Sequence, residues 1–131
     1  MRAFREAVEA RDFAAIDALL ADDVVFTSPV AFAPYPGRPI TLAILRHVIE
    51  VLEGFHYVRE LEDSPDSALV FQATVDGKAI TGCDFLHVNE AGQIDDFMVM
   101  VRPLSAAQAL AAQMGARFER IKAEAMEAMQ A

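Results

Sequence analysis

The sequence predicts an α+β fold in which helices come first, an antiparallel sheet follows and a last helix ends the chain. Apolar residues recur at helical spacing up to about residue 53, whereas between residues 56 and 102 they alternate in short runs. Turn signals at 64–66, 76–77 and 89–92 divide this second half. Sequential strands joined by short turns form an antiparallel meander, which we expect to be the sheet.

The first half predicts two short helices and one strand. Residues 2 to about 10 place apolar side chains on one helical face, and Asp12 is a capping residue for a second helix that starts at Phe13. Asp22 and Asp23 indicate a polar break, after which the β-branched and aromatic residues 24–27 predict a strand that ends at a proline.

A proline-rich loop then leads into a core helix. Four prolines between residues 29 and 39 prevent regular structure until about Ile40, and the helix that follows runs to Glu53, with Gly54 placed just past its end. The helix carries two apolar stripes, which predicts burial on more than one side. The strands of the meander and the last helix then cover residues 56–63, 67–76, 79–89, 94–102 and 105–129.

Length and composition favour one folded unit. A chain of 131 residues that is 54% hydrophobic can bury one core and leave apolar surface for a pocket or a partner. We expect a single domain over residues 1–131, with 105–129 as a C-terminal helical extension. No long apolar run indicates a membrane span or signal peptide, and the lone Cys83 cannot form an intrachain disulfide, so we expect a cytoplasmic protein.

Charge and motifs exclude several partners. A formal charge of −9 repels phosphate backbones and anionic lipids, so we expect neither nucleic acid nor membrane as a partner. Glycine-rich phosphate loops are absent, which argues against nucleotide cofactors. The spacing of Cys83, Asp84 and His87 matches no zinc motif. We therefore expect no cofactor and no metal ion.

The last strand is apolar on both faces. Phe97, Val99 and Val101 point to one side, whereas Met98 and Met100 point to the other. Helices can cover one face of the sheet in a domain of this length, so we expect the other face to pair with a second copy of the chain. The alternative is that the C-terminal helix covers the two methionines.

The stretch 20–38, LADDVVFTSPVAFAPYPGR, followed by a helix and an antiparallel sheet, resembles the cone-shaped NTF2-like superfamily. The similarity is greatest to its ketosteroid isomerase-like and SnoaL-like polyketide cyclase branch. This resemblance implies a curved sheet that wraps the N-terminal helices and the core helix, with the C-terminal helix over the mouth of the cone or across a partner. It also implies homodimers that pair through their sheets.

Laid along a ketosteroid isomerase, the chain keeps one polar member of the site. Phe4 falls at the tyrosine of the oxyanion hole, Ser28 at the catalytic aspartate and Leu45 at a supporting tyrosine. Asp84 falls at the second oxyanion-hole donor, which in those isomerases is an aspartic acid that apolar surroundings keep neutral. An unactivated serine hydroxyl is too weak a base near pH 7, so this steroid mechanism is disfavoured.

Asp84 is the leading candidate for an acid or base, with Tyr35 and Tyr57 as hydrogen-bond donors. Apolar neighbours on its strand face would raise its pKa through desolvation. The alternative is a structural aspartate that satisfies a buried polar group. The expected pocket holds an apolar or polycyclic molecule, and its expected ligand-binding residues are Phe13, Phe26, Val30, Phe32, Ile44, Val48, Phe71, Phe97, Val99 and Val101.

Two classes of function fit these observations. One is a cofactor-free isomerase, cyclase or hydrolase of the SnoaL-like kind that uses Asp84 as its acid or base. The other is a non-catalytic ligand-binding or structural dimerisation module, which the replacement of the isomerase base favours. Limonene epoxide hydrolases, a further branch, use an Arg-x-Asp pair, and here Gly82 stands in place of the arginine.

Overall fold

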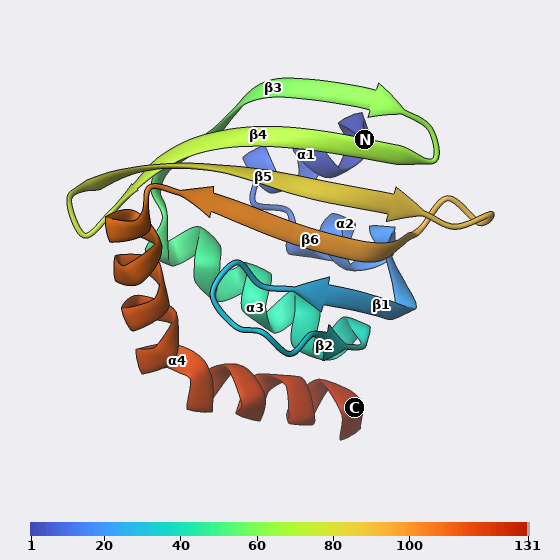
Figure 1. Cartoon of the computed structure of the whole chain (residues 1–131). Coiled ribbons are helices and arrows are strands. Elements are labelled where there is room, and N and C mark those ends of the chain that lie inside the picture. Colours follow the sequence, from blue (N-terminus) through green and yellow to red (C-terminus); the bar gives the residue numbers. More distant parts are fainter. Residues whose placement is uncertain (131) are drawn as a thin grey trace.

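A computed structural model describes residues 1–130 and has four helices and six strands (Figure 1). The predicted α+β class is confirmed. In chain order the elements are α1 (Arg2–Glu9), α2 (Phe13–Leu19), β1 (Leu20–Thr27), β2 (Tyr35–Pro36), α3 (Arg38–Val51), β3 (Glu53–Asp63), β4 (Asp66–Val75), β5 (Lys78–Val88), β6 (Ile94–Arg102) and α4 (Leu104–Gln130).

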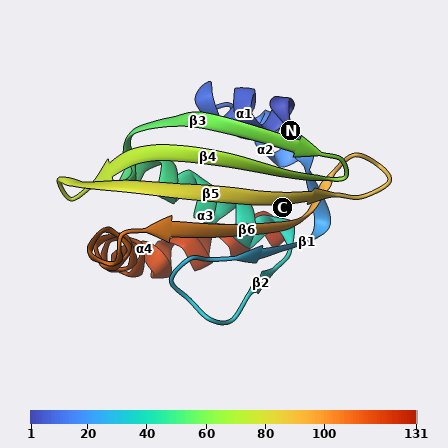
Figure 2. The ribbon, with the colours of Figure 1, turned by 45° about the horizontal axis from the view of Figure 1, so that its top comes forward.

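The strands form one mixed sheet in the order β2-β1-β6-β5-β4-β3. The predicted meander of β3 to β6 is antiparallel throughout, whereas β1 pairs with β6 in parallel. Figure 2 shows the strands side by side with the helices behind them. The sheet curves over α3, and α4 runs back along α3 at the open end of the cone (Figure 1).

Local sequence explains where the first elements begin. The Asp12 side chain accepts a hydrogen bond of 3.1 Å from the backbone N–H of Ala15, which caps α2 as expected. Gly37 precedes α3 with a φ of 104°, a conformation that only glycine adopts readily. Its N–H donates to the carbonyl of Val24 at 2.7 Å, which ties the start of α3 to β1.

Several boundaries differ from the sequence prediction, and α3 already begins at Arg38. Asp22 and Asp23 lie inside β1, because a register shift between Leu20 and Val25 lets both carboxylates stay exposed while the strand continues. Tyr35 and Pro36 form a short edge strand, where a proline costs no ladder hydrogen bond. The core helix ends at Val51, and Gly54 belongs to β3 instead of following the helix.

The concave face of the sheet carries the core. Phe97 packs between Phe4 of α1 and Phe26 of β1, with ring centroids 5.3 Å apart in both pairs. The inward row of β5 is Ile80, Gly82, Asp84 and Leu86, all buried. The concave face therefore brings one carboxyl group into an apolar interior.

The convex face of the sheet stays uncovered within one chain. Met100 is 54% exposed and Leu61 is 57% exposed, while α4 packs on the other side of the molecule. The alternative in which the C-terminal helix covers Met98 and Met100 is therefore wrong. Among the described helices, none combines the length and apolarity that a membrane span requires.

Candidate functional site

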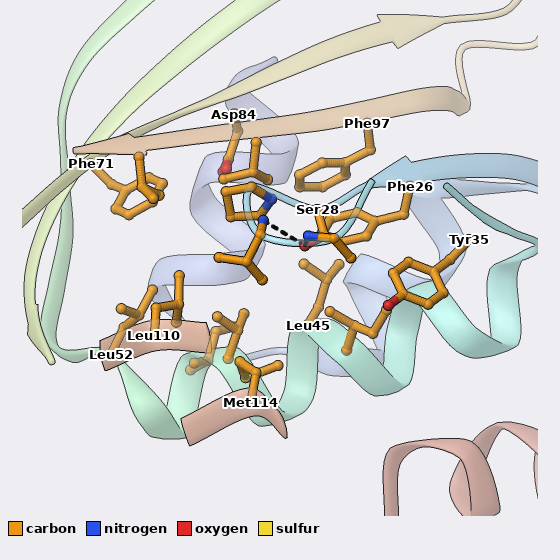
Figure 3. A pocket seen from close by; sticks show the side chains of 18 of the residues that line it. Phe26, Ser28, Tyr35, Leu45, Leu52, Phe71, Asp84, Phe97, Leu110 and Met114 are labelled. Carbon is orange, nitrogen blue, oxygen red and sulfur yellow. Dashed lines mark hydrogen bonds between the residues drawn. The ribbon is translucent and has the colours of Figure 1, made fainter. Parts of the chain in front are cut away.

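A cavity of about 400 Å³ lies between the concave face of the sheet, α3 and α4 (Figure 3). Its wall is apolar except for the side chains of Ser28, Tyr35, Tyr57 and Asp84. No lysine, arginine or histidine from residues 1–130 contributes to the wall. A molecule inside this cavity would meet aliphatic and aromatic groups on most sides and very few hydrogen-bonding groups.

Asp84 holds the most distinctive position in the wall. The residue is only 6% exposed, and the hydroxyl of Tyr57 on β3 donates a hydrogen bond of 2.7 Å to its Oδ2 atom. The Oδ1 atom has no hydrogen-bond partner within the described part of the chain. Figure 3 shows the carboxyl group directed from β5 into the cavity.

The position two residues before Asp84 explains why no positive charge faces it. A Cβ atom at Gly82 would lie 2.2 Å from Cζ of Phe71, so the Phe71 ring occupies the space that a side chain at 82 would need. The neighbouring ring of Phe55 packs on Phe71 with centroids 4.8 Å apart. Phenyl rings therefore cover the place where an epoxide-hydrolase-like arginine would stand.

Burial changes the proton affinity of this pair. Desolvation raises the pKa of Asp84 to about 7, although the hydrogen bond from Tyr57 opposes the shift by stabilising the anion. Burial, and then the nearby Asp84 carboxyl, raise the pKa of Tyr57 well above its usual value of 10.0. The Asp84 carboxyl can therefore give up or accept a proton near neutral pH, whereas Tyr57 stays a neutral donor.

Tyr35 lies in the wall but does not join this pair. Its ring packs on Phe118 of α4 with centroids 5.7 Å apart. Figure 3 shows Tyr35 and Asp84 at separate sides of the cavity, with the Tyr35 hydroxyl pointing inward. The structure thus brings Tyr57 and Asp84 together and leaves Tyr35 as a polar group at the opposite wall.

Ser28 and Phe4, which the resemblance aligns with the isomerase base and an oxyanion-hole donor, have structural roles in this chain. The Oγ atom of Ser28 accepts hydrogen bonds from the backbone N–H groups of Val30 and Ala31, at 3.0 and 3.1 Å, and so shapes the loop after β1. Phe4 is fully buried against Phe97. No second acidic side chain from the described residues lines the cavity beside Asp84.

Most of the expected pocket residues do line this cavity, and two do not. The residues in the wall are Tyr35, Tyr57, Asp84, Phe26, Val30, Ile44, Val48, Phe71, Phe97, Val99 and Val101. Phe32 is 100% exposed, because the proline-rich loop places Val30 and Ala31 at the edge of the cavity and carries Phe32 away from it. Phe13 packs beneath the guanidinium of Arg46, 5.6 Å from its ring centroid, and is absent from the wall.

The sequence-based prediction missed the contribution of α4. This helix supplies the wall residues Leu110, Ala111, Met114, Gly115, Phe118 and Ile121. The apolar stripe of the helix is visible in the sequence as Leu110, Met114, Phe118 and Ile121, but the stripe alone does not say against which surface it packs. Further wall residues outside the prediction are Phe4, Val8, Ser28, Pro29, Ala31, Leu45, Ile49, Leu52 and Phe55.

The three histidines lie outside the cavity. His47 on α3 is buried, and its Nε2 atom lies 2.9 Å from Oε1 of Glu124 on α4, so it ties the two helices together. His56 is exposed on β3, and His87 on the convex face pairs with Asp95 at 2.6 Å. Within residues 1–130, no three His, Cys, Asp or Glu side chains are grouped to hold a metal ion.

A curved sheet that encloses helices and a largely apolar cavity is the architecture of NTF2-like, ketosteroid isomerase-like proteins. Residues 1–97 match the SnoaL-like domain, and the chain belongs to this family. The predicted relationship to the NTF2-like superfamily is thereby confirmed.

Solved structures agree with this assignment. A steroid delta-isomerase from Pseudomonas aeruginosa is 38% identical over 92% of this chain and 89% of its own, with a TM-score of 0.85. An uncharacterised protein with a cystatin-like fold from Silicibacter pomeroyi DSS-3 is 35% identical over 94% of this chain and 92% of its own, with a TM-score of 0.84. No curated protein matches the chain in sequence.

Proposed function

We propose that this chain binds an apolar, ring-containing small molecule in its cavity and that Asp84 exchanges a proton with that molecule. In this proposal the protein is a cofactor-free isomerase, cyclase or hydrolase in which Tyr57 supports Asp84 and Tyr35 contacts the far end of the ligand. The volume of about 400 Å³ suits such a ligand, since small-molecule pockets measure roughly 300–1,000 Å³.

One observation carries the proposal, namely a buried carboxyl group in the wall of an otherwise apolar cavity. Burying a carboxyl with one neutral partner costs stability, so an apolar residue would serve a purely structural role better. A pKa of about 7 suits general acid or base chemistry, which is most efficient when the pKa lies near the working pH. The 38% identical relative described as a steroid delta-isomerase supports a proton-transfer activity on a ring system.

Binding is tested with an uncharged fluorophore such as 6-propionyl-2-(dimethylamino)naphthalene, whose emission shifts to the blue in apolar surroundings. We expect saturable binding that Ala111→Trp abolishes, because the indole would fill the space beside α4. Glu90→Gln, in an exposed turn, is the matched control and should bind normally. Met114→Trp is a second variant that should block the cavity, and circular dichroism verifies that both variants fold. If both tryptophan variants bind the fluorophore as tightly as the wild-type protein does, a binding site in the cavity is contradicted.

Catalysis is tested by following candidate ring-containing ligands by NMR in the presence of the protein. Any turnover should fall about 10²–10⁴-fold in Asp84→Asn, the usual range for loss of a general acid or base. It should also depend on one ionisation near pH 7. Turnover that Asp84→Asn leaves intact would exclude Asp84 from the chemistry.

A non-catalytic binding module is the second candidate. Two observations support it. The Ser28 hydroxyl oxygen accepts hydrogen bonds from two backbone N–H groups, and Phe4 offers no donor. Among the described residues, Asp84 is then the single acid in the cavity wall. Binding of a ring-containing ligand that survives in Asp84→Asn, with no turnover of any bound candidate, is the result that this alternative predicts.

We also propose that the convex face of the sheet pairs with a second copy of the chain. Leu61, Ala68, Phe85 and Met98 face one another across four neighbouring strands, and Cys83 and Met100 form the next row. Phe85 is 38% exposed and Met100 is 54% exposed, so one chain alone leaves this apolar strip in contact with solvent. A self-complementary strip of this kind fits a symmetric dimer.

A further inference from the structure

The charges around the cavity restrict the kind of molecule that it can hold. We propose that its ligand is an apolar molecule that bears a basic nitrogen, and that this nitrogen, in its protonated form, pairs with the Asp84 carboxylate. The inference rests on the proposed function of the same cavity and makes it more specific.

An anionic ligand would find no positively charged partner in this cavity. The wall contains no lysine, arginine or histidine among the described residues, and its one acidic group, Asp84, would repel a carboxylate or phosphate. Burying an unpaired anion is strongly unfavourable in apolar surroundings. The formal charge of −9 on the whole chain acts in the same direction, because it attracts cations and repels anions.

The direction of the Tyr57 hydrogen bond separates a basic nitrogen from a neutral carbonyl. A site built for a carbonyl oxygen aims its phenolic donor at the ligand. Here the phenol donates to Oδ2 of Asp84 at 2.7 Å, so it supports the carboxylate that remains when Asp84 loses its proton. Oδ1, which has no partner within residues 1–130, is the atom left to face the ligand.

The proton transfer balances without a further reactant. A neutral amine takes the Oδ1 proton of neutral Asp84, because the O–H bond breaks and the nitrogen lone pair binds the proton. An amine that enters already protonated meets the carboxylate directly, or displaces the Asp84 proton to solvent. Each route ends in an Asp84 carboxylate and a protonated nitrogen. These two charges then form a charge-assisted hydrogen bond, which is roughly twice as strong as a neutral one. Tyr57 holds the second carboxylate oxygen, so the anion is bound on both sides.

Aromatic rings line the cavity near Asp84 and would surround a ligand at this place. Phe71 covers Gly82 beside Asp84, and Phe55 packs on Phe71 at 4.8 Å. Phe97, whose ring lies 5.3 Å from that of Phe26, also lines the cavity. A protonated nitrogen that contacts the face of one of these rings would gain a cation–π attraction, which grows where water is excluded.

The test compares three ligands that share one ring system: 2-naphthylmethylamine, 2-naphthylmethanol and 2-naphthoate. They are titrated calorimetrically at pH 8, where Asp84 is mainly the carboxylate and the amine is mainly the ammonium ion. We expect the amine to bind about tenfold more tightly than the alcohol, and the carboxylate to bind most weakly. In Asp84→Asn the advantage of the amine over the alcohol should disappear. In Tyr57→Phe it should shrink, while Glu90→Gln, the matched control, should keep it.

The outcomes separate this inference from the proposed function. If the alcohol binds as tightly as the amine, or if the carboxylate binds best, the inference of a basic nitrogen is wrong, whereas the proposal of binding in the cavity still holds. If the amine keeps its advantage in folded Asp84→Asn, the nitrogen does not pair with Asp84 and the inference also fails. If none of the three ligands binds the wild-type protein, the proposed function fails together with the inference.

Discussion

The two faces of the sheet are apolar in the middle, but only one of them is covered within the chain. On the concave face Leu69, Phe71 and Phe97 are at most 2% exposed beneath α1, α3 and α4. On the convex face Leu61 and Met100 are more than half exposed. The concave row also contains Asp84, whereas the convex row alternates apolar groups with small or polar ones such as Cys83 and Thr81.

This difference separates the cavity from the proposed contact surface. A buried carboxyl in the concave row has no structural necessity, because any apolar residue would complete that row at lower cost. The exposed strip on the convex face contains no buried polar group like Asp84. Apolar strips of this kind are typical of surfaces that contact another protein. Substitutions that reach only one face can therefore test the two roles separately.

The largest effect concerns the steroid reaction at the concave face. We expect no measurable isomerisation of a 5-ene-3-ketosteroid, because Ser28 replaces the base and Phe4 replaces an oxyanion donor. A general base contributes about 10²–10⁴-fold and one oxyanion donor about 10²–10³-fold to such a rate. A steady-state absorbance assay checks this, with Ser28→Asp as the variant expected to gain rate. Wild-type turnover at the level of a true isomerase would show that the site positions are wrongly matched.

The next effect concerns the convex face. Met98→Glu combined with Met100→Glu should convert the proposed dimer into a monomer, because carboxylates in a desolvated interface cost several kcal/mol. Sedimentation velocity at micromolar concentration measures the change in mass. Glu90→Gln should remain dimeric. A double variant that keeps the wild-type mass would place the interface elsewhere, and a monomeric wild type would remove the proposal.

A third prediction links the buried carboxyl to stability. The folded-state pKa of Asp84, about 7, lies above its ordinary value of 3.8, so its proton stabilises the folded protein below about pH 4 and this contribution is lost as the pH rises to 7. The free energy of unfolding of Asp84→Asn relative to wild type should therefore rise by a few kcal/mol between pH 4 and pH 8. Urea denaturation measures it; a difference that does not vary with pH would disprove a buried, protonated Asp84.

The smallest effect concerns the exposed loop beside the cavity. Phe32→Ser should change the free energy of unfolding by no more than about 0.5 kcal/mol, because a fully exposed ring loses no packing. It should also leave binding of the uncharged fluorophore unchanged. A loss of more than about 1 kcal/mol, well beyond the usual range for a surface substitution, would mean that Phe32 is buried in solution, for example against a second copy.

Most of the elements and the main polar residue were predictable from the sequence for local reasons, whereas the edge strand β2 was not. Strand alternation alone placed Asp84 in an apolar row opposite to Cys83 and His87, and the structure has this parity. The cap at Asp12 and the turns between β3, β4, β5 and β6 likewise depend on neighbouring residues only. Such features are predictable because no distant contact is needed to define them.

The partners of these residues were not predictable in the same way. The contact between Tyr57 and Asp84 joins β3 to β5 and depends on the curvature of the sheet and its register shifts. The stripe on α4 fitted equally well over the convex face or over the mouth, and only the packing against α3 decides. Phe32 was misplaced because the sequence of a proline-rich loop indicates its stiffness and not its direction.

The most direct test is the titration of Asp84 by carbon-13 NMR in protein labelled at the aspartate carboxyl carbons. Asp84→Asn identifies the signal, because one resonance disappears from the spectrum. A carboxyl buried in an apolar cavity with Tyr57 as its partner predicts an apparent pKa of about 7. An apparent pKa at or below about 3.9, the value of an unperturbed aspartate, would show a solvated or ion-paired group and would contradict the central role of Asp84.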